Sequence, residues 1–428
     1  MQTFRIEGGR PLHGEVTPSG NKNAALPLLA ACLLTDQPIV LRNVPDIGDV
    51  RTMRRLLESL GVQFETLDVH TWRVQAGEVR RADLDPDICR KMRASILLAG
   101  PMTVRSGGVS LPPPGGDVIG RRRIDTHILA LRALGAEVVY RGREFNFSAS
   151  QRLHGADLLL DEASVTATEN AIMAAVTARG ESVIRNAASE PHVQDLCAFL
   201  NSLGARIDNI GSNTLHVHGV DRLGGGEFTI GSDYLEVVSF IGAAAVTGGS
   251  VRIRSAGPEH LNMARLVFQR LGVRWEVDGQ DIVVPSGQRL EVEPDLGGAI
   301  PSISVMPWPA FPTDLMSAAI VVASQSKGTV LFHDWMFEGR MFFIDKLVSM
   351  GARIILCDPH RCIVEGPRRL VGETLESPDI RAGLALVLAA LAADGSSTIR
   401  NIGQIDRGYE RIDEKLRNLG AAIERVDI

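Results

Sequence analysis

The stretch LLESLGVQF, residues 56–64, decides the fold because its pattern occurs six times along the chain. In each copy an apolar, helix-like run ends at Leu-Gly or Met-Gly, and a strand-like run follows. This pattern predicts a glycine in the left-handed conformation that closes a helix, followed by a strand. Six copies at a spacing of 68–79 residues indicate a repeated architecture. The other five copies are LRALGAEVV (131–139), LNSLGARID (200–208), FQRLGVRWE (268–276), LVSMGARII (347–355) and LRNLGAAIE (416–424).

Each repeat contains more than this one helix. A short strand and a turn with an acidic residue precede it, as in IVLRNVPDIGD (39–49), and alanine-rich apolar helices are predicted before several of these strands, as in AALPLLAACLL (24–34). A solenoid would need polar capping repeats, and none is evident in the sequence. We therefore expect six units of about 70 residues to form two pseudo-threefold domains, with the alanine-rich helices buried inside sheets and outer helices. The glycine-rich stretch LGGGEFTIG (223–231) is expected to be the hinge.

The composition is that of an ordinary soluble globular protein, with 45% apolar and 22% charged residues in 428. A net charge of −6 gives no overall basic field for nucleic acid. The longest apolar runs, 24–34 and 384–393, are too short to span a bilayer, and the N-terminus lacks a signal-peptide pattern. Five scattered cysteines without a CxxC pair predict reduced thiols rather than a metal site. We expect a cytoplasmic protein without nucleic-acid partners or membrane insertion.

Six motifs are spread along the chain: GEVTPSGNKNAALPLLAACLL (14–34), KMRASILLAGP (91–101), PPGGDVIG (113–120), FPTDL (311–315), FEGRMF (337–342) and IDRGYERI (405–412). They resemble those of the enolpyruvyl transferase family, and the resemblance covers essentially the whole chain. The Asn21-Lys22-Asn23 stretch is similar to the branch that acts on a nucleotide sugar rather than on shikimate phosphate, where Ser-Lys-Ser is usual.

The resemblance implies an α/β (α+β) fold, the inverse α/β prism, with one domain at 22–229, a second at 1–21 plus 230–428, and the active site in the cleft between them. It also implies transfer of the enolpyruvyl group of phosphoenolpyruvate to the 3-hydroxyl of UDP-N-acetylglucosamine, through a tetrahedral ketal that loses phosphate. This is the first committed step of peptidoglycan synthesis, and it requires no metal or organic cofactor. Two alternatives stay open: the same chemistry on another nucleotide sugar, and a catalytically silent binding or regulatory protein. The oligomeric state is not predicted.

A set of cations matches the family's phosphoenolpyruvate site. Lys22 precedes an apolar helix, and a helix N-terminus favours anions. Guanidinium groups suit a bidentate grip on phosphate and carboxylate. Any one of these cations alone would more often be a surface residue. The resemblance assigns phosphoenolpyruvate binding to Lys22, Arg93, Arg122, Arg340, Arg381 and Arg407, with Lys22 and Arg407 also among the catalytic residues.

Carboxylates supply the proposed acid and base. Asp314 matches the family's base for the sugar hydroxyl, although Asp is also a preferred helix N-cap. Asp117 lies in a glycine-rich loop, expected to be a mobile lid, where many relatives have the cysteine that acts as general acid and is alkylated by fosfomycin. A protonated carboxyl can replace that acid, so we expect intrinsic fosfomycin resistance; an exposed loop aspartate is the alternative. Asp379 and Asp406 are expected to orient Arg381 and Arg407 or to take part in proton transfer.

The nucleotide-sugar side departs from the family pattern at several positions. Thr166 replaces a glycine whose bare backbone lets a ligand approach. Glu162 stands where lysine is frequent, and Arg123 where proline is usual. The stretch 233–236 reads Asp-Tyr-Leu-Glu instead of Asp-Arg-Ile-Glu. These changes lie on the nucleotide side, whereas the phosphoenolpyruvate side matches the family pattern. By resemblance the nucleotide-sugar contacts are Asn23, Arg122, Arg123, Asp125, His127, Ser164, Val165, Thr166, Asp314 and Met336.

Overall fold

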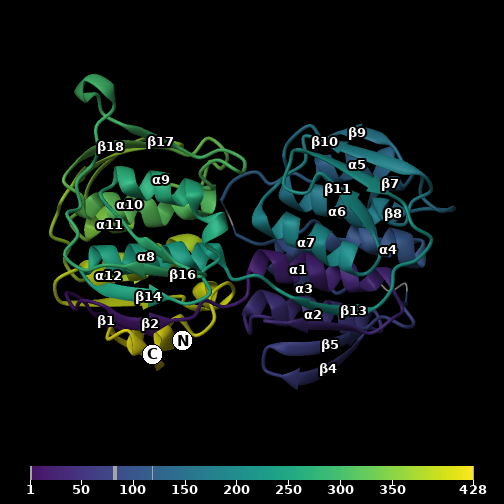
Figure 1. Cartoon of the computed structure of the whole chain (residues 1–428), viewed down its shortest axis with the longest axis horizontal. Helices are drawn as coiled ribbons and strands as arrows, with labels where there is room; N and C mark the ends of the chain where they lie inside the picture. Colours follow the sequence, from purple (N-terminus) through teal and green to yellow (C-terminus); the bar gives the residue numbers. More distant parts are fainter. Residues whose placement is uncertain (1, 81–83, 118, 428) are drawn as a thin grey trace. The chain divides into compact units, whose positions relative to one another are not determined.

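The computed structural model describes residues 2–80, 84–117 and 119–427 (Figure 1). Internal contacts divide these residues into two units. Unit 1 comprises the described parts of Met1–Ser19, Val118–Arg121 and Ser232–Ile428, and unit 2 comprises those of Gly20–Asp117 and Arg122–Gly231. Each unit has its own hydrophobic core.

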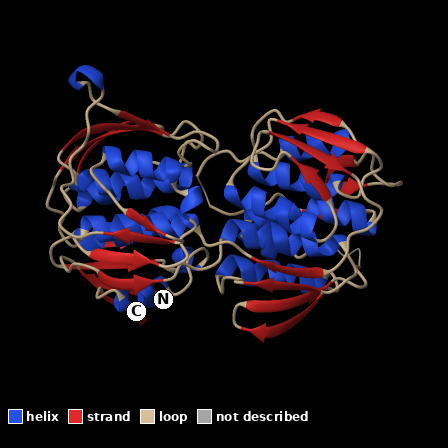
Figure 2. Cartoon of the chain, viewed as in Figure 1, coloured by secondary structure: helices blue, strands red, loops and turns tan. Residues whose placement is uncertain are grey.

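Alanine-rich helices form the centre of each unit, and Figure 2 shows strands around them. In unit 1 the three central helices contact one another, and nearly every residue of them is buried. A helix that is apolar on all faces must be surrounded by protein, and small side chains allow the close approach. The central helices are α8 (Tyr234–Val246), α10 (Met316–Gln325) and α12 (Ile380–Ala392) in unit 1, and α1 (Lys22–Ala31), α4 (Ala99–Ser106) and α6 (Val165–Ala175) in unit 2.

The predicted helix–glycine–strand pattern is confirmed in all six repeats. Each glycine has a positive φ, from +86° at Gly272 to +100° at Gly204, and a strand follows it. The six helices are α2 (Gly48–Ser59), α5 (Asp125–Ala133), α7 (Pro191–Ser202), α9 (Asn262–Arg270), α11 (Ile344–Ser349) and α14 (Ile412–Asn418). Two shorter helices, α3 (Pro86–Lys91) and α13 (Gly403–Asp406), and several 3₁₀ turns complete the described helical structure.

Two of the three described sheets of unit 2 share one topology. In these two, a strand pairs in parallel with one neighbour and in antiparallel fashion with a hairpin on its other side. The orders are β13 (Gly226–Thr229)–β3 (Ile39–Arg42)–β5 (Thr71–Gln75)–β4 (Gln63–Asp68), β9 (Asp157–Leu159)–β10 (Glu181–Arg185)–β12 (Thr214–His218)–β11 (Arg206–Asp208), and, within the described residues, β6 (Gly108–Leu111)–β8 (Glu144–Ser148)–β7 (Glu137–Arg141).

Unit 1 repeats this topology three times. The orders are β2 (His13–Val16)–β14 (Ser250–Ile253)–β16 (Asp281–Val284)–β15 (Glu276–Asp278), β17 (Ser302–Ser304)–β18 (Gly328–His333)–β20 (Arg361–Gly366)–β19 (Arg353–Asp358), and β21 (Thr374–Glu376)–β22 (Ser396–Arg400)–β1 (Gln2–Glu7)–β23 (Ala422–Asp427). Six related sheets around two sets of three central helices make the fold an inverse α/β prism.

The two ends of the chain meet in one sheet of unit 1. Strand β1 pairs with both β22 and β23, so that Phe4 lies opposite Ile399 on one side and Arg425 on the other. Phe4 and Ile6 are fully buried. In the last repeat, the strand between β22 and β23 is therefore β1, from the N-terminus, rather than a strand of the same repeat.

The glycine-rich stretch 223–231, which was expected to be the hinge, contains a strand. Gly226–Thr229 forms β13, which pairs with β3 inside unit 2, and a Cβ at Gly225 would lie 2.5 Å from the Pro38 carbonyl oxygen. Gly225 is required because its backbone lies close to that of Pro38. The chain passes into unit 1 only after this strand, between Gly231 and Ser232.

The departure at residues 233–236 keeps its two acidic side chains in structural roles. The Asp233 carboxylate caps α8 by accepting from the backbone N–H groups of Leu235 and Glu236, at 2.9 and 3.3 Å. The buried Glu236 carboxylate accepts from Lys415 Nζ at 2.6 Å and from the backbone N–H of Ser19 at 2.8 Å. A buried charge needs such partners, so this pair ties the N-terminal segment to the start of α8.

Among the helices that the structure describes, none combines the length and the apolar character needed to cross a bilayer.

Two of the repeat glycines allow a matched test of backbone strain against steric overlap. An alanine at Gly204 meets no atom within 4 Å, so Gly204→Ala is expected to cost only the left-handed conformation, about 1–2 kcal/mol of unfolding free energy. An alanine at Gly272 would place Cβ 2.4 Å from the Glu291 nitrogen and 2.7 Å from the Arg289 oxygen. Gly272→Ala should therefore cost clearly more in urea denaturation. Equal losses for the two variants would contradict this account.

Candidate active site

The candidate residues of unit 1 form one ion-paired cluster around Asp314. Its Oδ1 accepts from Arg340 Nη2 at 2.9 Å, and its Oδ2 accepts from Arg381 Nε at 3.3 Å. The two arginine side chains are only 3% and 5% exposed, whereas the Asp314 side chain is 28% exposed. The cluster therefore buries its cations and presents its carboxylate at the surface of the unit.

Asp314 is not a helix cap. It lies in the 3₁₀ turn Thr313–Leu315 that precedes α10, and the N-cap position of α10 is Leu315, without a side-chain hydrogen bond. The alternative that the sequence left open, a capping aspartate, is thus wrong. Both carboxylate oxygens face guanidinium groups instead.

Asp379 and Asp406 differ in what they hold. The Asp379 carboxylate caps α12 and accepts from the backbone N–H of Arg381 at 2.8 Å, so it fixes the position of that arginine through the backbone. Asp406 was expected to orient Arg407, but its carboxylate binds Arg425 at 2.7 and 2.9 Å. Arg407 Nη1 donates to Gln404 Oε1 at 2.8 Å. The close sequence neighbours 406 and 407 point to different partners because they lie on successive positions of a helical turn.

Residues without a predicted role complete the cluster in unit 1. The buried Tyr409 accepts from Arg381 Nη1 at 2.8 Å, and the guanidinium carbon lies 5.2 Å from the centre of its ring. Burial raises the pKa of the Tyr409 phenol to about 12, against the opposing effect of Arg381. Thr313 accepts from Arg340 Nε at 3.2 Å. Met336, which the resemblance gave as a nucleotide-sugar contact, is half-buried against the core of unit 1. Thr313 and Tyr409 lie inside the FPTDL and IDRGYERI motifs. Their place in these motifs was the signal in the sequence that could have identified them as site residues.

In unit 2, Lys22 is the first residue of α1, after the Asn21 cap. Its Nζ lies 3.0 Å from Asp49 Oδ2, and the two side chains are 12% and 6% exposed. Lys22 is therefore not a solvated surface lysine. The sequence did not identify Asp49 as its partner, although Asp49 belongs to the acidic turn that precedes the outer helix in each repeat. Asn23, the next residue of α1, is half-buried.

Arg93 begins the 3₁₀ segment before α4, and its Nη2 donates to the Arg123 carbonyl at 2.7 Å. Burial and the neighbouring positive charge of Arg122 lower the pKa of Arg93 to about 10, and the Glu162 carboxylate opposes this shift. Arg93 is still charged at neutral pH. Glu162, which replaces a frequent lysine, thus acts as a counter-charge to the arginines around it.

The glycine-rich loop lies against the Arg93 segment. A Cβ at Gly115 would fall 1.5 Å from the Arg90 carbonyl oxygen, and Gly116, at φ +99°, packs against Arg93. These glycines are needed for a close approach of two backbones, whether or not the loop moves. Asp117 follows them and is half-buried. Residues 119–121 belong to unit 1, where the Ile119 carbonyl accepts from the backbone N–H of Gly339 at 2.8 Å.

The Thr166 substitution has a partner in the structure. Thr166 Oγ1 lies 2.9 Å from Nε2 of the buried His127, so the extra hydroxyl is satisfied within the protein. Burial and the charge of Arg93 lower the pKa of His127 to about 3, and its Nδ1 is buried without a hydrogen bond. Ser164 and Val165 lie at the start of the same helix, α6. Nearby, Arg123 Nε and Asp125 Oδ2 form an exposed ion pair at 2.8 Å.

The structure therefore gathers the candidates into two sets, one in each unit. Asp314, Arg340 and Arg381 are in direct contact in unit 1, and Lys22, Arg93 and the α6 start each have charged or polar partners in unit 2. Within the described residues, no three or more His, Cys, Asp or Glu side chains are grouped so as to hold a metal ion.

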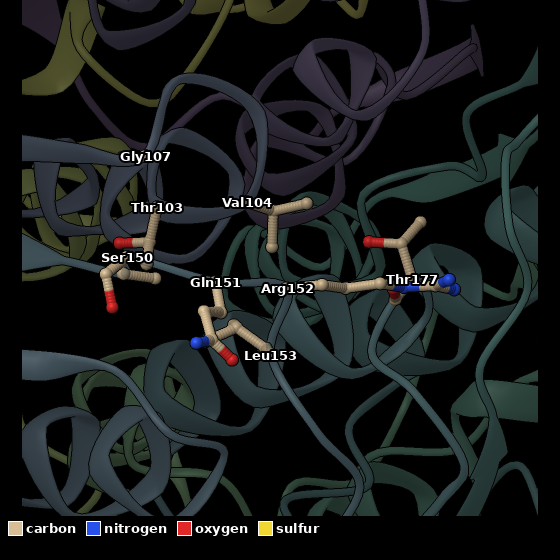
Figure 3. A pocket seen from close by; sticks show the side chains of 9 residues that line it. Thr103, Val104, Gly107, Ser150, Gln151, Arg152, Leu153 and Thr177 are labelled. Atoms are coloured by element: carbon tan, nitrogen blue, oxygen red, sulfur yellow. The ribbon is translucent and has the colours of Figure 1, made fainter.

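A pocket of about 320 Å³ in unit 2 is separate from these residues (Figure 3). None of the candidate residues lines it. Arg152 lines the pocket, and its guanidinium donates to Asp221 and to the carbonyls of Thr177 and Val220 at 2.8 Å each. With its charge already satisfied, this arginine does not make the pocket an anion site.

The burial of neutral His127 predicts a pH-dependent contribution to stability. Since its pKa falls from 6.5 to about 3 on folding, the unfolded chain binds one more proton between these values. The free energy of unfolding should therefore fall by about 1.4 kcal/mol per pH unit from this group as the pH decreases below 6.5. Urea denaturation at pH 7, 6 and 5 should show the deficit of His127→Asn shrinking as the pH falls. His13→Gln, at an exposed histidine, is the control; a deficit of His127→Asn that is constant with pH would contradict the assignment.

Comparison with known proteins places the chain in a family. The family model described as EPSP synthase (3-phosphoshikimate 1-carboxyvinyltransferase) matches residues 6–416. The UDP-N-acetylglucosamine 1-carboxyvinyltransferase of Bradyrhizobium diazoefficiens is 56% identical, over 99% of this chain and 98% of its own. Proteins of the same name from Treponema denticola and Bacteroides thetaiotaomicron are 52% and 46% identical, over at least 99% of both chains.

Solved structures support the fold. The enolpyruvyl transferase NikO from Streptomyces tendae superposes with a TM-score of 0.87 at 24% identity, covering 99% of both chains. EPSP synthase from Acinetobacter baumannii gives a TM-score of 0.77 at 18% identity over the whole of both chains. Since the family model spans nearly the whole sequence and full-length relatives share about half of its residues, the chain belongs to the EPSP synthase family of enolpyruvyl transferases.

Proposed function

We propose that this enzyme transfers the enolpyruvyl group of phosphoenolpyruvate to the 3-hydroxyl of UDP-N-acetylglucosamine and releases phosphate, the committing step of peptidoglycan synthesis. The observation that carries the proposal is the partly exposed Asp314 carboxylate held by the buried Arg340 and Arg381. Relatives that are 45–56% identical over their full length bear the name of this activity. Both sets of candidate residues are proposed to act on one pair of substrates.

The arginines are proposed to exchange partners when substrate binds. Phosphoenolpyruvate carries a phosphate and a carboxylate, which guanidinium groups bind in bidentate fashion. Arg340 and Arg381 are already fixed by Thr313, Tyr409 and the α12 backbone, so they lose little side-chain freedom on binding. A substrate anion that competes for these arginines releases Asp314 to act as a base. Lys22, Arg93, Arg122 and Arg407 supply the remaining positive charge.

Two aspartates are proposed to move the protons. In the addition step the sugar oxygen bonds to C2 of phosphoenolpyruvate, Asp314 accepts the hydroxyl proton, and Asp117 donates a proton to C3. In the elimination step the bond from C2 to the phosphate oxygen breaks, the Asp117 carboxylate takes a proton back from C3 to restore the double bond, and phosphate leaves. Asp117 must be protonated for this role, and desolvation in the substrate complex favours the neutral form of a carboxyl.

The acceptor is proposed to be UDP-N-acetylglucosamine despite the substitutions on the nucleotide side. The charge of Glu162 acts on Arg93 and Arg123 and is balanced by them. The Thr166 hydroxyl is satisfied by His127. A second candidate, the same chemistry on another nucleotide sugar, is favoured by the bulk that Thr166 adds at a position where glycine is usual.

Phosphate release from phosphoenolpyruvate in the presence of UDP-N-acetylglucosamine tests the reaction. Asp314→Asn and Asp117→Asn keep the side-chain shape but remove proton transfer, so each should lower kcat by about 10²–10⁴-fold. Asp345→Asn, at an exposed position of α11, should retain activity. A panel of other nucleotide sugars decides the acceptor: faster turnover with one of them would select the second candidate, and no turnover with any would contradict the proposed reaction.

Asp117 also predicts the response to fosfomycin, which alkylates the cysteine found at this position in many relatives. A carboxylate is a much poorer nucleophile toward the drug than a thiolate. The native enzyme should therefore show no time-dependent inactivation, whereas Asp117→Cys should be inactivated and labelled at position 117, as mass spectrometry can detect. Time-dependent inactivation of the native enzyme would contradict the prediction.

A further inference from the structure

Arg340 is held by a chain of hydrogen bonds that runs away from the reacting groups. Its Nε donates to Thr313 Oγ1 at 3.2 Å, and Thr313 Oγ1 donates to Asp334 Oδ2 at 2.5 Å. The other end of the same guanidinium, Nη2, binds Asp314. Asp334 thus lies three hydrogen bonds from the proposed base, Asp314, through Thr313 and Arg340, and does not contact it.

The donors and acceptors of this chain allow only one arrangement. A guanidinium group only donates hydrogen bonds, so Thr313 must accept from Arg340. Its single hydroxyl proton is then free to point only at Asp334, and Asp334 Oδ2 must accept it. Because Asp334 accepts the hydroxyl proton of Thr313, a lone pair of the Thr313 oxygen stays directed at Arg340.

Asp334 is itself fixed on every side. It is fully buried, directly after strand β18. Its Oδ1 accepts from the backbone N–H groups of Met336 and Phe337 at 3.1 and 3.3 Å. Its backbone N–H donates to the His360 carbonyl at 2.8 Å, and its carbonyl pairs with His360 Nδ1 at 2.7 Å. With Oδ1 occupied by two donors, Oδ2 is the oxygen available to Thr313.

We propose that Asp334 and Thr313 are positioning residues for Arg340: the carboxylate commits the threonine proton, and the threonine lone pair aims the guanidinium at Asp314 and at the bound phosphoenolpyruvate. This inference rests on the proposed function, in which Arg340 binds that substrate. Asp334 thereby has a role in the reaction although it contacts neither the substrate nor Asp314.

The variant Asp334→Asn tests hydrogen-bond polarity with almost no change in shape. The amide oxygen can still accept from Met336 and Phe337, which places the NH₂ group against Thr313. Thr313 then faces two donors, and its own proton loses its acceptor. The KM for phosphoenolpyruvate should rise about tenfold or more, since buried polar groups left unpaired are costly, while the KM for UDP-N-acetylglucosamine should change little because the turn at 336–337 is kept.

Asp358 provides a matched control. Its Oδ1 also accepts from a backbone N–H in a turn, that of His360, at 2.8 Å, and its side chain pairs with Arg361. It has the same local role as Asp334 but no contact with Thr313. Asp358→Asn should therefore leave both KM values unchanged, which separates the hydrogen-bond chain from a general effect of turn geometry.

Two threonine variants keep the test decisive if Asp334→Asn folds poorly. Thr313→Ser preserves the hydroxyl and should retain a KM for phosphoenolpyruvate within about twofold of the native value, whereas Thr313→Val should raise it as Asp334→Asn does. The double variant Asp334→Asn/Thr313→Val should be no worse than Thr313→Val alone, because both changes break one chain.

Three results would overturn the proposal: an unchanged KM for phosphoenolpyruvate in Asp334→Asn and Thr313→Val, an equal rise of both KM values, or additive effects in the double variant. Native turnover tests the proposed function separately from these comparisons. A crystal structure of Asp334→Asn gives a readout without catalysis: Arg340 Nε should move away from Thr313 Oγ1, and an unmoved guanidinium would contradict the inference.

Discussion

The structure depends on the burial of central helices that are apolar on every face. Helices such as α8 and α12 expose almost no residue, so each must be covered on all sides by other helices and by sheet. Three sheets around three helices satisfy this need, and repetition of one unit of about 70 residues supplies them. The insertion of β1 into the last sheet has the same cause. Strand β1 packs against α12, and without it the buried face of α12 would be exposed.

This packing also explains where the candidate site residues lie. In unit 1 the start of α10 carries Asp314 and the start of α12 carries Arg381, and the two side chains are in contact. The start of α8 contributes Asp233, whose charge acts on Arg381. In unit 2 the starts of α1 and α6 and the segment before α4 carry Lys22, Thr166 and Arg93. Related helices begin at related places, so the pseudo-threefold fold collects helix N-termini, which favour anions.

Buried positive charge is balanced in the same way in both units. Three buried or half-buried cations of the candidate site have a carboxylate or an aromatic ring as partner: Lys22 has Asp49, Arg340 has Asp314, and Arg381 has both Asp314 and Tyr409. Desolvation makes an unpaired buried charge expensive. In the proposed mechanism an anionic substrate binds by replacing a carboxylate that already faces the arginines, and the displaced Asp314 becomes available for proton transfer.

The sequence by itself determined the repeats, the glycines that end the outer helices and the buried alanine-rich helices, because these depend on local periodicity and backbone conformation. Its motifs also selected the charged residues of the candidate site. Only the tertiary structure decided the partners: that Asp314 binds two arginines and caps no helix, that Asp406 binds Arg425, that Glu162 offsets Arg93, and that Thr166 meets His127. The roles of Asp49, Thr313, Asp334 and Tyr409 likewise emerge only in three dimensions. Such contacts join residues tens of positions apart, and their geometry is set by how the repeats pack rather than by the spacing of residues along the chain.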